Sequence, residues 1–184
     1  MLDRAIIDHA SPTLARLKLG NLFNYPRNAD FDAEFADLRA LLGKKGVALT
    51  VLRETRDRAL LYIYRADELK KALRGDAVRR LLKSCGYTRF DVDGALEALK
   101  LRLNDADAFP HEIGVFLGYP LEDVLGFIEN GGKNCLACGC WKVYANECAA
   151  LKAFKRYEKC KSVYQRLFAS GCPLSRLTVA ARPA

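Results

Sequence analysis

Two β-rich runs interrupt a sequence whose other regular segments have mostly helical patterns. The runs VALTVLR (47–53) and ALLYIYR (59–65) are separated by the five charged or polar residues ETRDR. Two such runs joined by a short polar segment predict an antiparallel hairpin over 47–65. We therefore expect an α+β fold, in which mostly helical segments surround a small, largely antiparallel sheet.

The helical segments are indicated by apolar residues at a spacing of three and four. They are expected at 30–43, 66–74, 76–85, 91–106, 111–118, 120–130 and 146–170. Residues 11–26 are interpreted as a capped turn of helix followed by an irregular aromatic stretch. A short strand is predicted at 139–144, with Trp141 and Val143 on one side. Because it alternates and carries aromatic residues as the hairpin does, we expect it in or beside the hairpin sheet.

Length and composition indicate a globular protein. The chain has 184 residues, 51% of them hydrophobic and 28% charged. We expect a single domain over 1–172 and a loose C-terminal tail over 173–184. No apolar run approaches the roughly 20 residues of a membrane-spanning helix, and the N-terminal residues do not resemble a signal peptide. The odd number of cysteines, seven, favours reduced thiols and a cytoplasmic location.

The net charge of +8 is concentrated in residues 145–184, which contain eight basic and two acidic side chains. This suggests nucleic-acid binding through the C-terminal helix, although an ordinary solvated helix face explains the same pattern. Its exposed cations would be Lys152, Lys155, Arg156, Lys159 and Arg166. Segment 112–128 also has the spacing of a helix-turn-helix. Its second helix would carry Glu122, Asp123 and Glu129 but no Lys or Arg, which argues against nucleic acid as a partner.

The segment 110–144 concentrates residues suited to a functional site. It contains His111, the single tryptophan of the chain, several glycines and three cysteines. Our leading interpretation is a small-ligand-binding or accessory protein whose pocket is built by this segment and by strand 60–65. The candidate ligand-binding residues are Arg65, Glu112, Tyr119, Asp123, Trp141, Lys142 and Tyr144. Glu112 and Lys142 are expected to lie close together, flanked by Tyr119 and Trp141.

An enzyme is the second interpretation of the same segment. Glu112 or His111 would act as a general base, and Lys142 would stabilise an anion. Cys138 beside His111 would form a minimal Cys–His pair, although no third, orienting residue is implied.

A metal site is a further alternative. Cys135, Cys138 and Cys140 lie within six residues, and Cys148 could complete a set of four. Thiolates are suitable ligands for zinc or an iron–sulfur cluster. The spacing is not that of paired CxxC motifs, however, and a strand through 138–140 would resist wrapping around a metal. Small buried thiols explain the same residues.

Several separated motifs, in order, resemble a bacterial family known as domain of unknown function 3793. They are SPTLA and NLF near the start, LLYIYR at 60–65, HEIGVFLGYPLEDVLGFIENGGKN and CGCWKVY. The resemblance covers nearly the whole chain, and it implies no substrate because the family has no established activity. Its pattern includes Cys138 but usually another residue at position 135. A metal site that used both cysteines would therefore be a local feature of this sequence. The signature positions correspond to Pro12, Leu14, Tyr64, Arg65, Glu112, Gly114, Leu117, Gly118, Tyr119, Pro120, Asp123, Val124, Phe127, Gly139, Trp141, Lys142 and Tyr144.

Overall fold

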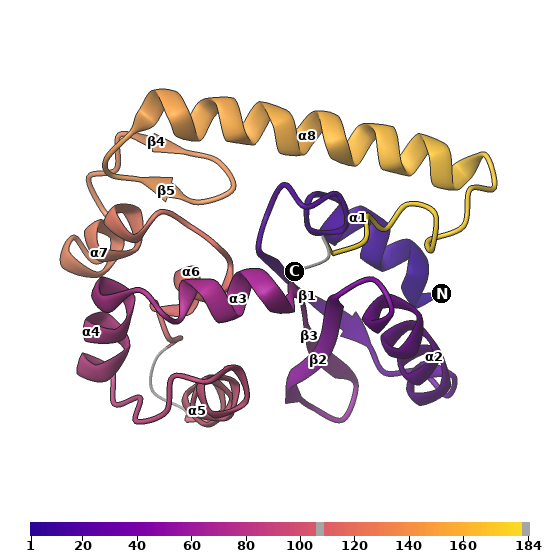
Figure 1. Cartoon of the computed structure of the whole chain (residues 1–184), viewed down its shortest axis with the longest axis horizontal. Helices are drawn as coiled ribbons and strands as arrows, with labels where there is room; N and C mark the ends of the chain where they lie inside the picture. Colours follow the sequence, from indigo (N-terminus) through magenta and orange to yellow (C-terminus); the bar gives the residue numbers. More distant parts are fainter. Residues whose placement is uncertain (106–108, 182–184) are drawn as a thin grey trace.

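The sheet at the centre of the molecule has three antiparallel strands in the order β1-β3-β2 (Figure 1). A computed structural model describes residues 1–105 and 109–181. The strands are β1 (Gly20–Pro26), β2 (Val47–Glu54) and β3 (Arg58–Arg65). The predicted hairpin is confirmed, with Val47 opposite Arg65. β3 is the middle strand, and all its residues after Arg58 are buried, as its nearly continuous apolar sequence requires.

The third strand, β1, was interpreted from the sequence as an irregular stretch, and that interpretation is wrong. β1 pairs with β3 along its whole length, from Gly20 opposite Tyr64 to Pro26 opposite Arg58. Its sequence GNLFNYP contains two asparagines and a proline, which are depleted in strands. Pairing with the apolar strand β3, about 40 residues later in the chain, overrides this weak local preference.

Alternation along β3 divides the apolar interior into two parts. Leu60, Tyr62 and Tyr64 belong to one cluster of buried side chains, which we call the first core. Leu61 and Ile63 belong to the other, the second core. Neighbouring residues of a strand point to opposite faces of the sheet, so each core lies on its own face.

Two N-terminal helices and the long C-terminal helix lie on the side of the second core. They are α1 (Leu2–Leu14), α2 (Phe31–Gly43) and α8 (Glu147–Ala169). The helices predicted at 30–43 and 146–170 are confirmed, whereas α1 is much longer than the predicted turn. α8 runs along one side of the molecule, from the small β-hairpin to α1 (Figure 1). Tyr164 and Phe168 of α8 pack on the second core, whereas Leu151, at the other end of the helix, is 41% exposed.

Shorter helices form the side of the first core. They are α3 (Ala66–Ala72), α4 (Asp76–Ser84), α5 (Val92–Asn104), α6 (Ile113–Phe116) and α7 (Leu121–Glu129). All five were predicted with similar limits, except that α6 has only four residues; residue 106 of the predicted 91–106 helix lies outside the described residues. Asp91 caps α5 by accepting a hydrogen bond from Gly94 N–H at 2.9 Å. None of the described helices has both the length and the apolar character needed to cross a membrane.

The strand predicted at 139–144 is shorter than expected and is not part of the main sheet. β5 (Lys142–Val143) pairs with β4 (Ala137–Cys138) in a separate two-stranded sheet, the β4–β5 hairpin. The β4–β5 hairpin instead packs between α7 and α8 (Figure 1). The aromatic residues that it shares with the 47–65 hairpin therefore did not indicate that the two would pair.

Residues 173–181 pack on the domain, whereas the sequence suggested a loose tail. Leu174 and Leu177 are buried in the second core. Val179 N–H donates to Leu14 O at 3.0 Å, and Ala181 N–H donates to Lys45 O at 3.0 Å. Residues 182–184 of the predicted tail lie outside the described residues.

Candidate functional site: a cavity beside Trp141

Asp123, in the first turn of α7, holds the β4–β5 hairpin in place. Its carboxylate accepts hydrogen bonds from Trp141 Nε1 at 2.7 Å, Tyr144 N–H at 2.7 Å and Ala145 N–H at 3.0 Å. The side chain is buried, and a carboxylate in the first turn of a helix is favoured by the free N–H groups there. Three of the predicted site residues, Asp123, Trp141 and Tyr144, are thus brought together. Asp123 acts in this arrangement as an acceptor that orients the indole ring.

Trp141 is further fixed by aromatic neighbours. The Tyr119 ring stacks on it with a centroid distance of 5.0 Å, and Phe154 of α8 meets it edge-on at 4.5 Å. Tyr119 Oη donates to Cys140 O at 3.1 Å, and burial is the main cause that raises the pKa of Tyr119 to about 12. Gly139 allows this approach, because a Cβ there would lie 2.4 Å from the Phe154 ring. The indole is therefore held in one orientation by its hydrogen bond to Asp123 and by its contacts with the Tyr119 and Phe154 rings.

The fixed Trp141 ring forms one wall of a cavity of about 260 Å³, which we call the Trp141 cavity. Its remaining walls are mostly apolar and come from α6, α7 and the β4–β5 hairpin. Its lining comprises Phe109, His111, Ile113, Gly114, Tyr119, Asp123, Val124, Phe127, Cys138, Gly139, Trp141 and Lys142. The sequence predicted a pocket built by segment 110–144 together with strand 60–65. Apart from Phe109, the lining residues of this cavity come from segment 110–144, and no residue of strand 60–65 lines it.

Lys142 and His111 are the basic side chains of the Trp141 cavity. Lys142 Nζ donates to Gly132 O at 2.6 Å and lies 5.8 Å from the centre of the Phe127 ring. The His111 ring meets the same Phe127 ring edge-on at 5.0 Å, and His111 is exposed. An ammonium group has three N–H donors, so Lys142 keeps donors for a bound group.

The expected pair of Glu112 with Lys142 is not formed. Glu112 is buried and accepts hydrogen bonds from Tyr87 Oη at 3.1 Å and from Arg102 Nε. Its bond to Arg102 is the main cause that raises the pKa of that guanidinium, and burial together with the Glu112 charge raises the pKa of Tyr87. The partner is Arg102 because α5 ends beside the start of α6. Glu112 does not line the Trp141 cavity, so the geometry does not place it as a general base there.

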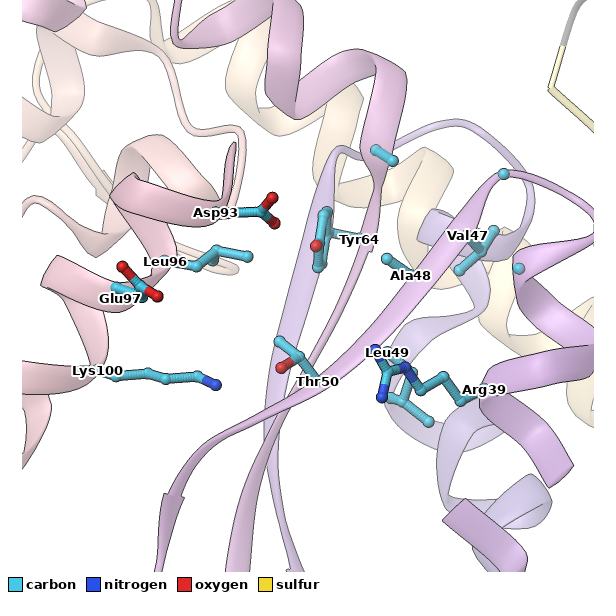
Figure 2. Close-up of a pocket in the computed structure, with 13 residues that line it drawn as sticks. Arg39, Val47, Ala48, Leu49, Thr50, Tyr64, Asp93, Leu96, Glu97 and Lys100 are labelled. Atoms are coloured by element: carbon cyan, nitrogen blue, oxygen red, sulfur yellow. The ribbon is translucent and has the colours of Figure 1, made fainter. Parts of the chain in front are cut away.

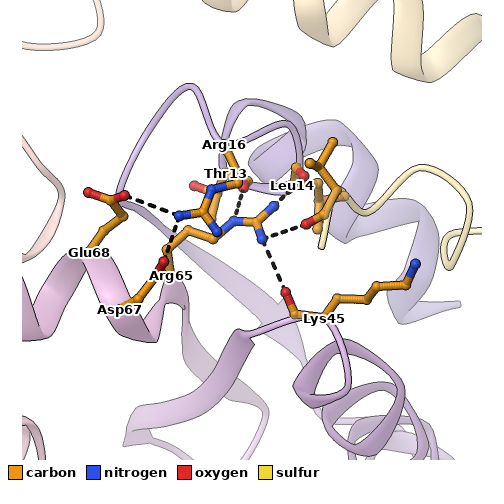
Figure 3. A network of polar contacts seen from close by, with 8 residues as sticks. Thr13, Leu14, Arg16, Lys45, Arg65, Asp67 and Glu68 are labelled. Atoms are coloured by element: carbon orange, nitrogen blue, oxygen red, sulfur yellow. Dashed lines mark hydrogen bonds and ion pairs between the residues drawn. The ribbon is translucent and has the colours of Figure 1, made fainter. Parts of the chain in front are cut away.

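Arg65 also lies away from the Trp141 cavity, at the end of β3. Its guanidinium donates to four backbone carbonyls, those of Thr13, Leu14, Lys45 and Val179 (Figure 3). The side chain is fully buried, and this burial is the main cause that lowers its pKa to about 10. Because its donors are occupied by the backbone, Arg65 joins chain segments and is not positioned to contact a ligand.

The four candidate metal-ligating cysteines are not assembled into one site. Cys138 lines the Trp141 cavity, and Cys140 lines a neighbouring cavity of about 480 Å³ on the other side of Gly139. No group of three or more His, Cys, Asp or Glu side chains within residues 1–105 and 109–181 is arranged to hold a metal ion. The described residues therefore give no geometric support to a zinc or iron–sulfur site on Cys135, Cys138, Cys140 and Cys148.

The cavity that includes Cys140 contains residues that the sequence analysis missed. His9 of α1 and Lys18 line it together with Tyr119 and Tyr157. Lys18 Nζ lies 5.2 Å above the Tyr119 ring, and burial lowers the pKa of Lys18 to about 8. Sequence analysis could not single out Lys18, because its environment depends on contact between segments about 100 residues apart.

The basic side chains of α8 are exposed, as predicted.

Comparison with known proteins gives a family but no characterised relative. No curated protein and no solved structure matches the chain. The sequence model of one family, described as protein of unknown function (DUF3793), matches residues 6–178, nearly the whole chain. The chain therefore belongs to the DUF3793 family.

Proposed function

We propose that the protein binds a small aromatic carboxylate in the Trp141 cavity. The observation that carries this proposal is a mostly apolar cavity with a rigidly held indole wall and a lysine ammonium at its side. Ligand sites are commonly built in this way, from apolar and aromatic walls with a few placed polar groups.

The size of the cavity favours a ligand with one ring. Sites for drug-sized ligands have volumes of roughly 300–1,000 Å³, and the Trp141 cavity, at about 260 Å³, is slightly smaller. A single ring would contact Val124, Phe127 and Trp141. Its carboxylate would then reach Lys142 Nζ, whose bond to Gly132 O occupies one of three donors.

A binding role fits the surroundings of the carboxylates better than an enzymatic one. Glu112 is paired with Arg102 and Tyr87 outside the cavity, and Asp123 is occupied by three N–H donors. A general base needs a free acceptor within reach of the substrate proton. Of the two general bases considered for the enzyme alternative, His111 lines the cavity and Glu112 does not.

The single tryptophan of the chain provides the test, because it forms the wall of the cavity. The emission of Trp141 is recorded during titration with benzoate and, separately, with the neutral analogue benzyl alcohol. Benzoate is expected to change the emission saturably and to bind more tightly than benzyl alcohol. Native mass spectrometry of the purified protein, together with metal analysis, would reveal any ligand retained from the cell.

Two variants test whether the Lys142 ammonium contacts the carboxylate of the ligand, or whether loss of any nearby lysine changes binding. Lys142→Met is expected to remove the preference for benzoate over benzyl alcohol. Lys133→Met changes an exposed lysine beside the Gly132 carbonyl and should leave both titrations unchanged. The proposal is wrong if neither probe gives a saturable response, or if Lys142→Met binds benzoate as tightly as the parent protein.

A further inference from the structure

A lysine without an ionic partner lines the cavity on the other side of Gly139 from the Trp141 cavity. This is the cavity of about 480 Å³ that contains Cys140, and we call it the Lys18 cavity. Its walls come from α1, the segment between α1 and β1, the β4–β5 hairpin and α8. It is large enough for a small organic molecule.

Lys18 is held in this cavity by the packing of its neighbour Leu19. Gly118, in the turn between α6 and α7, has a φ of +73°, and a Cβ there would lie 2.6 Å from Leu19 Cβ. This close contact places Lys18 beside Tyr119, with its Nζ 5.2 Å from the centre of the Tyr119 ring. The Lys18 side chain is half-buried and lines the cavity, so a molecule bound there can reach its amine.

The carboxylates of the Lys18 cavity do not pair with Lys18. Asp8 accepts hydrogen bonds from Arg4 Nε at 3.0 Å and Gln165 Nε2 at 2.6 Å, and Glu158 is exposed. Within residues 1–105 and 109–181, the Lys18 amine makes neither an ion pair nor a hydrogen bond. A cation that is removed from water without a counter-ion is disfavoured relative to its neutral form.

The remaining titratable neighbour of Lys18 is a thiol. Burial raises the pKa of Cys140, so this thiol stays protonated at neutral pH and provides no negative charge for Lys18. Burial is accordingly the main cause that lowers the pKa of Lys18 from 10.5 to about 8. Because a neutral amine has a free lone pair, a desolvated lysine of this kind is suited to attack a carbonyl carbon.

Lys100 of α5 is a matched comparison, since it is also half-buried and lines a cavity, of about 450 Å³, beside β2. In that cavity Glu97 precedes Lys100 by one helical turn, and Asp93 lies one turn further back (Figure 2). Residues three or four apart are neighbours on a helix surface. Lys100 therefore has a carboxylate beside it, whereas Lys18 has none.

Tyr157 of α8 supplies a proton donor in the Lys18 cavity. Its phenol makes no hydrogen bond to the part of the chain that the structure describes, and burial raises its pKa, so it carries its proton at neutral pH. The other phenol of the cavity, on Tyr119, is already occupied by its bond to Cys140 O.

We propose that Lys18 is a nucleophile that forms an imine with a small uncharged aldehyde bound in the Lys18 cavity. The lone pair of Nζ forms a bond to the carbonyl carbon, and a proton passes from nitrogen to oxygen to give a carbinolamine. The Tyr157 phenol then protonates the hydroxyl group, which leaves as water, and the phenolate takes the remaining proton from nitrogen. One water is released for each imine, and the proposal is independent of ligand binding in the Trp141 cavity.

The charges of the Lys18 cavity favour an uncharged aldehyde over an anionic one. When Lys18 is neutral, Asp8 and Glu158 outnumber the exposed Lys161, so the cavity has no positive excess to attract a carboxylate. Leu22 and Leu117 provide apolar walls for a short alkyl chain.

Reductive trapping of the intact protein with butanal and sodium cyanoborohydride tests the proposal. The reductant converts an imine into a stable secondary amine, which peptide mass spectrometry locates on a particular lysine. At pH 7 an amine with a pKa of about 8 is neutral in about 10% of molecules, against about 0.03% for the ordinary value of 10.5. With limiting butanal, Lys18 is therefore expected to carry at least ten times more label than Lys100 or the exposed Lys155.

The dependence of labelling on pH separates a lowered pKa from simple accessibility. Between pH 7 and pH 9 the neutral fraction rises roughly tenfold less for Lys18 than for a lysine of ordinary pKa. The ratio of label on Lys18 to label on Lys155 should fall accordingly, and this ratio cancels any effect of pH on the reductant. The other titratable side chains of the cavity are Asp8, His9, Tyr119, Cys140, Tyr157, Glu158 and Lys161.

Two tyrosine variants test the proton donor, and a second aldehyde tests the charge preference. Tyr157→Phe is expected to slow labelling of Lys18 at least threefold without changing that of Lys155. Tyr164→Phe, on the same helix but outside the cavity, is the matched control and should leave both rates unchanged. Glyoxylate, an anionic aldehyde, should label Lys18 less than butanal does.

Three results would overturn the proposal. The first is a Lys18 that is labelled no faster than Lys100, and the second is a ratio of Lys18 to Lys155 label that does not change with pH. The third is faster labelling of Lys18 by glyoxylate than by butanal, which would show an anion site. Equal labelling of Lys18 in Tyr157→Phe and Tyr164→Phe would contradict the role assigned to the Tyr157 phenol.

Discussion

Arg102 and Glu112 form an ion pair that joins the last turn of α5 to the start of α6. The Glu112 side chain is 3% exposed and the Arg102 side chain 41%, and Arg102 also donates to Cys85 O at 2.9 Å. The buried carboxylate thus depends on a partner that solvent partly screens. The pair fixes the segment that leads into the Trp141 cavity.

Removing Arg102 is expected to destabilise the protein by leaving Glu112 buried with only Tyr87 as a donor. Loss of one partner of a buried pair costs roughly 3–5 kcal/mol. Because Arg102 is partly exposed, we expect a smaller loss, about 2 kcal/mol, for Arg102→Leu in urea unfolding. Adding Glu112→Gln should recover part of this loss. Arg4→Leu, in the exposed pair with Asp8, should cost less than about 1 kcal/mol. Additive effects of the two substitutions at 102 and 112 would contradict the pairing.

Asp123→Ala should loosen the β4–β5 hairpin. It removes the common acceptor of three N–H groups, and we expect a loss of about 3 kcal/mol in the free energy of unfolding. Trp141 emission should shift to longer wavelength, since the indole N–H becomes free to bind water. Glu122→Ala, at the neighbouring exposed position, should change neither quantity. An unshifted emission maximum in Asp123→Ala would show that the aromatic contacts alone fix the ring.

Arg65→Met should cost about 4 kcal/mol, because four backbone carbonyls lose their donor in a buried region. Arg65→Lys should recover only a part, since a single ammonium cannot reproduce the planar set of donors. Chemical denaturation measures both. Benzoate binding per folded molecule should stay unchanged in both variants, because Arg65 does not line the Trp141 cavity. A selective loss of binding in Arg65→Lys would mean that it does.

The pKa of Lys18, about 8, makes stability depend on pH. Since the ordinary value is 10.5, the folded state binds fewer protons than the unfolded state between about 8 and 10.5. The contribution of Lys18 to the free energy of unfolding should therefore increase steadily as pH rises from about 8 to 10.5. Lys18→Met should be more stable than the parent at pH 7, with a difference that shrinks towards pH 10.5. Parallel pH curves for the two proteins, measured by urea unfolding, would contradict the shifted pKa.

The parts of the fold that were predicted are those specified by neighbouring residues. The hairpin 47–65 has a period of two and a polar turn, and α5 has apolar positions at helical spacing with a capping Asp91. β1 was not predicted because its own residues disfavour a strand. The β4–β5 hairpin was placed wrongly because a sequence pattern indicates that a strand forms, but not with which strand it pairs.

Segment 110–144 lines a cavity, but only some of the contacts predicted for the candidate site are formed. Trp141, Tyr119 and Lys142 line one cavity, as expected for residues close together in a glycine-rich segment. Glu112 was assigned the wrong partner because two basic residues, Lys142 and Arg102, were available and only tertiary structure decides between them. The acceptors of Arg65 are backbone carbonyls, which every residue carries, so no sequence pattern distinguishes them.

The contacts of Arg65 also bear on the order of events during synthesis on the ribosome. Three of its acceptors, on Thr13, Leu14 and Lys45, precede Arg65 in the chain, whereas Val179 O follows it by 114 residues. While the chain is being made, the sheet can form with the guanidinium bonded to these earlier carbonyls and still open to water. The last bond forms only after residue 179 has emerged. The second core, which Leu174 and Leu177 complete, must therefore close late, after translation has passed α8.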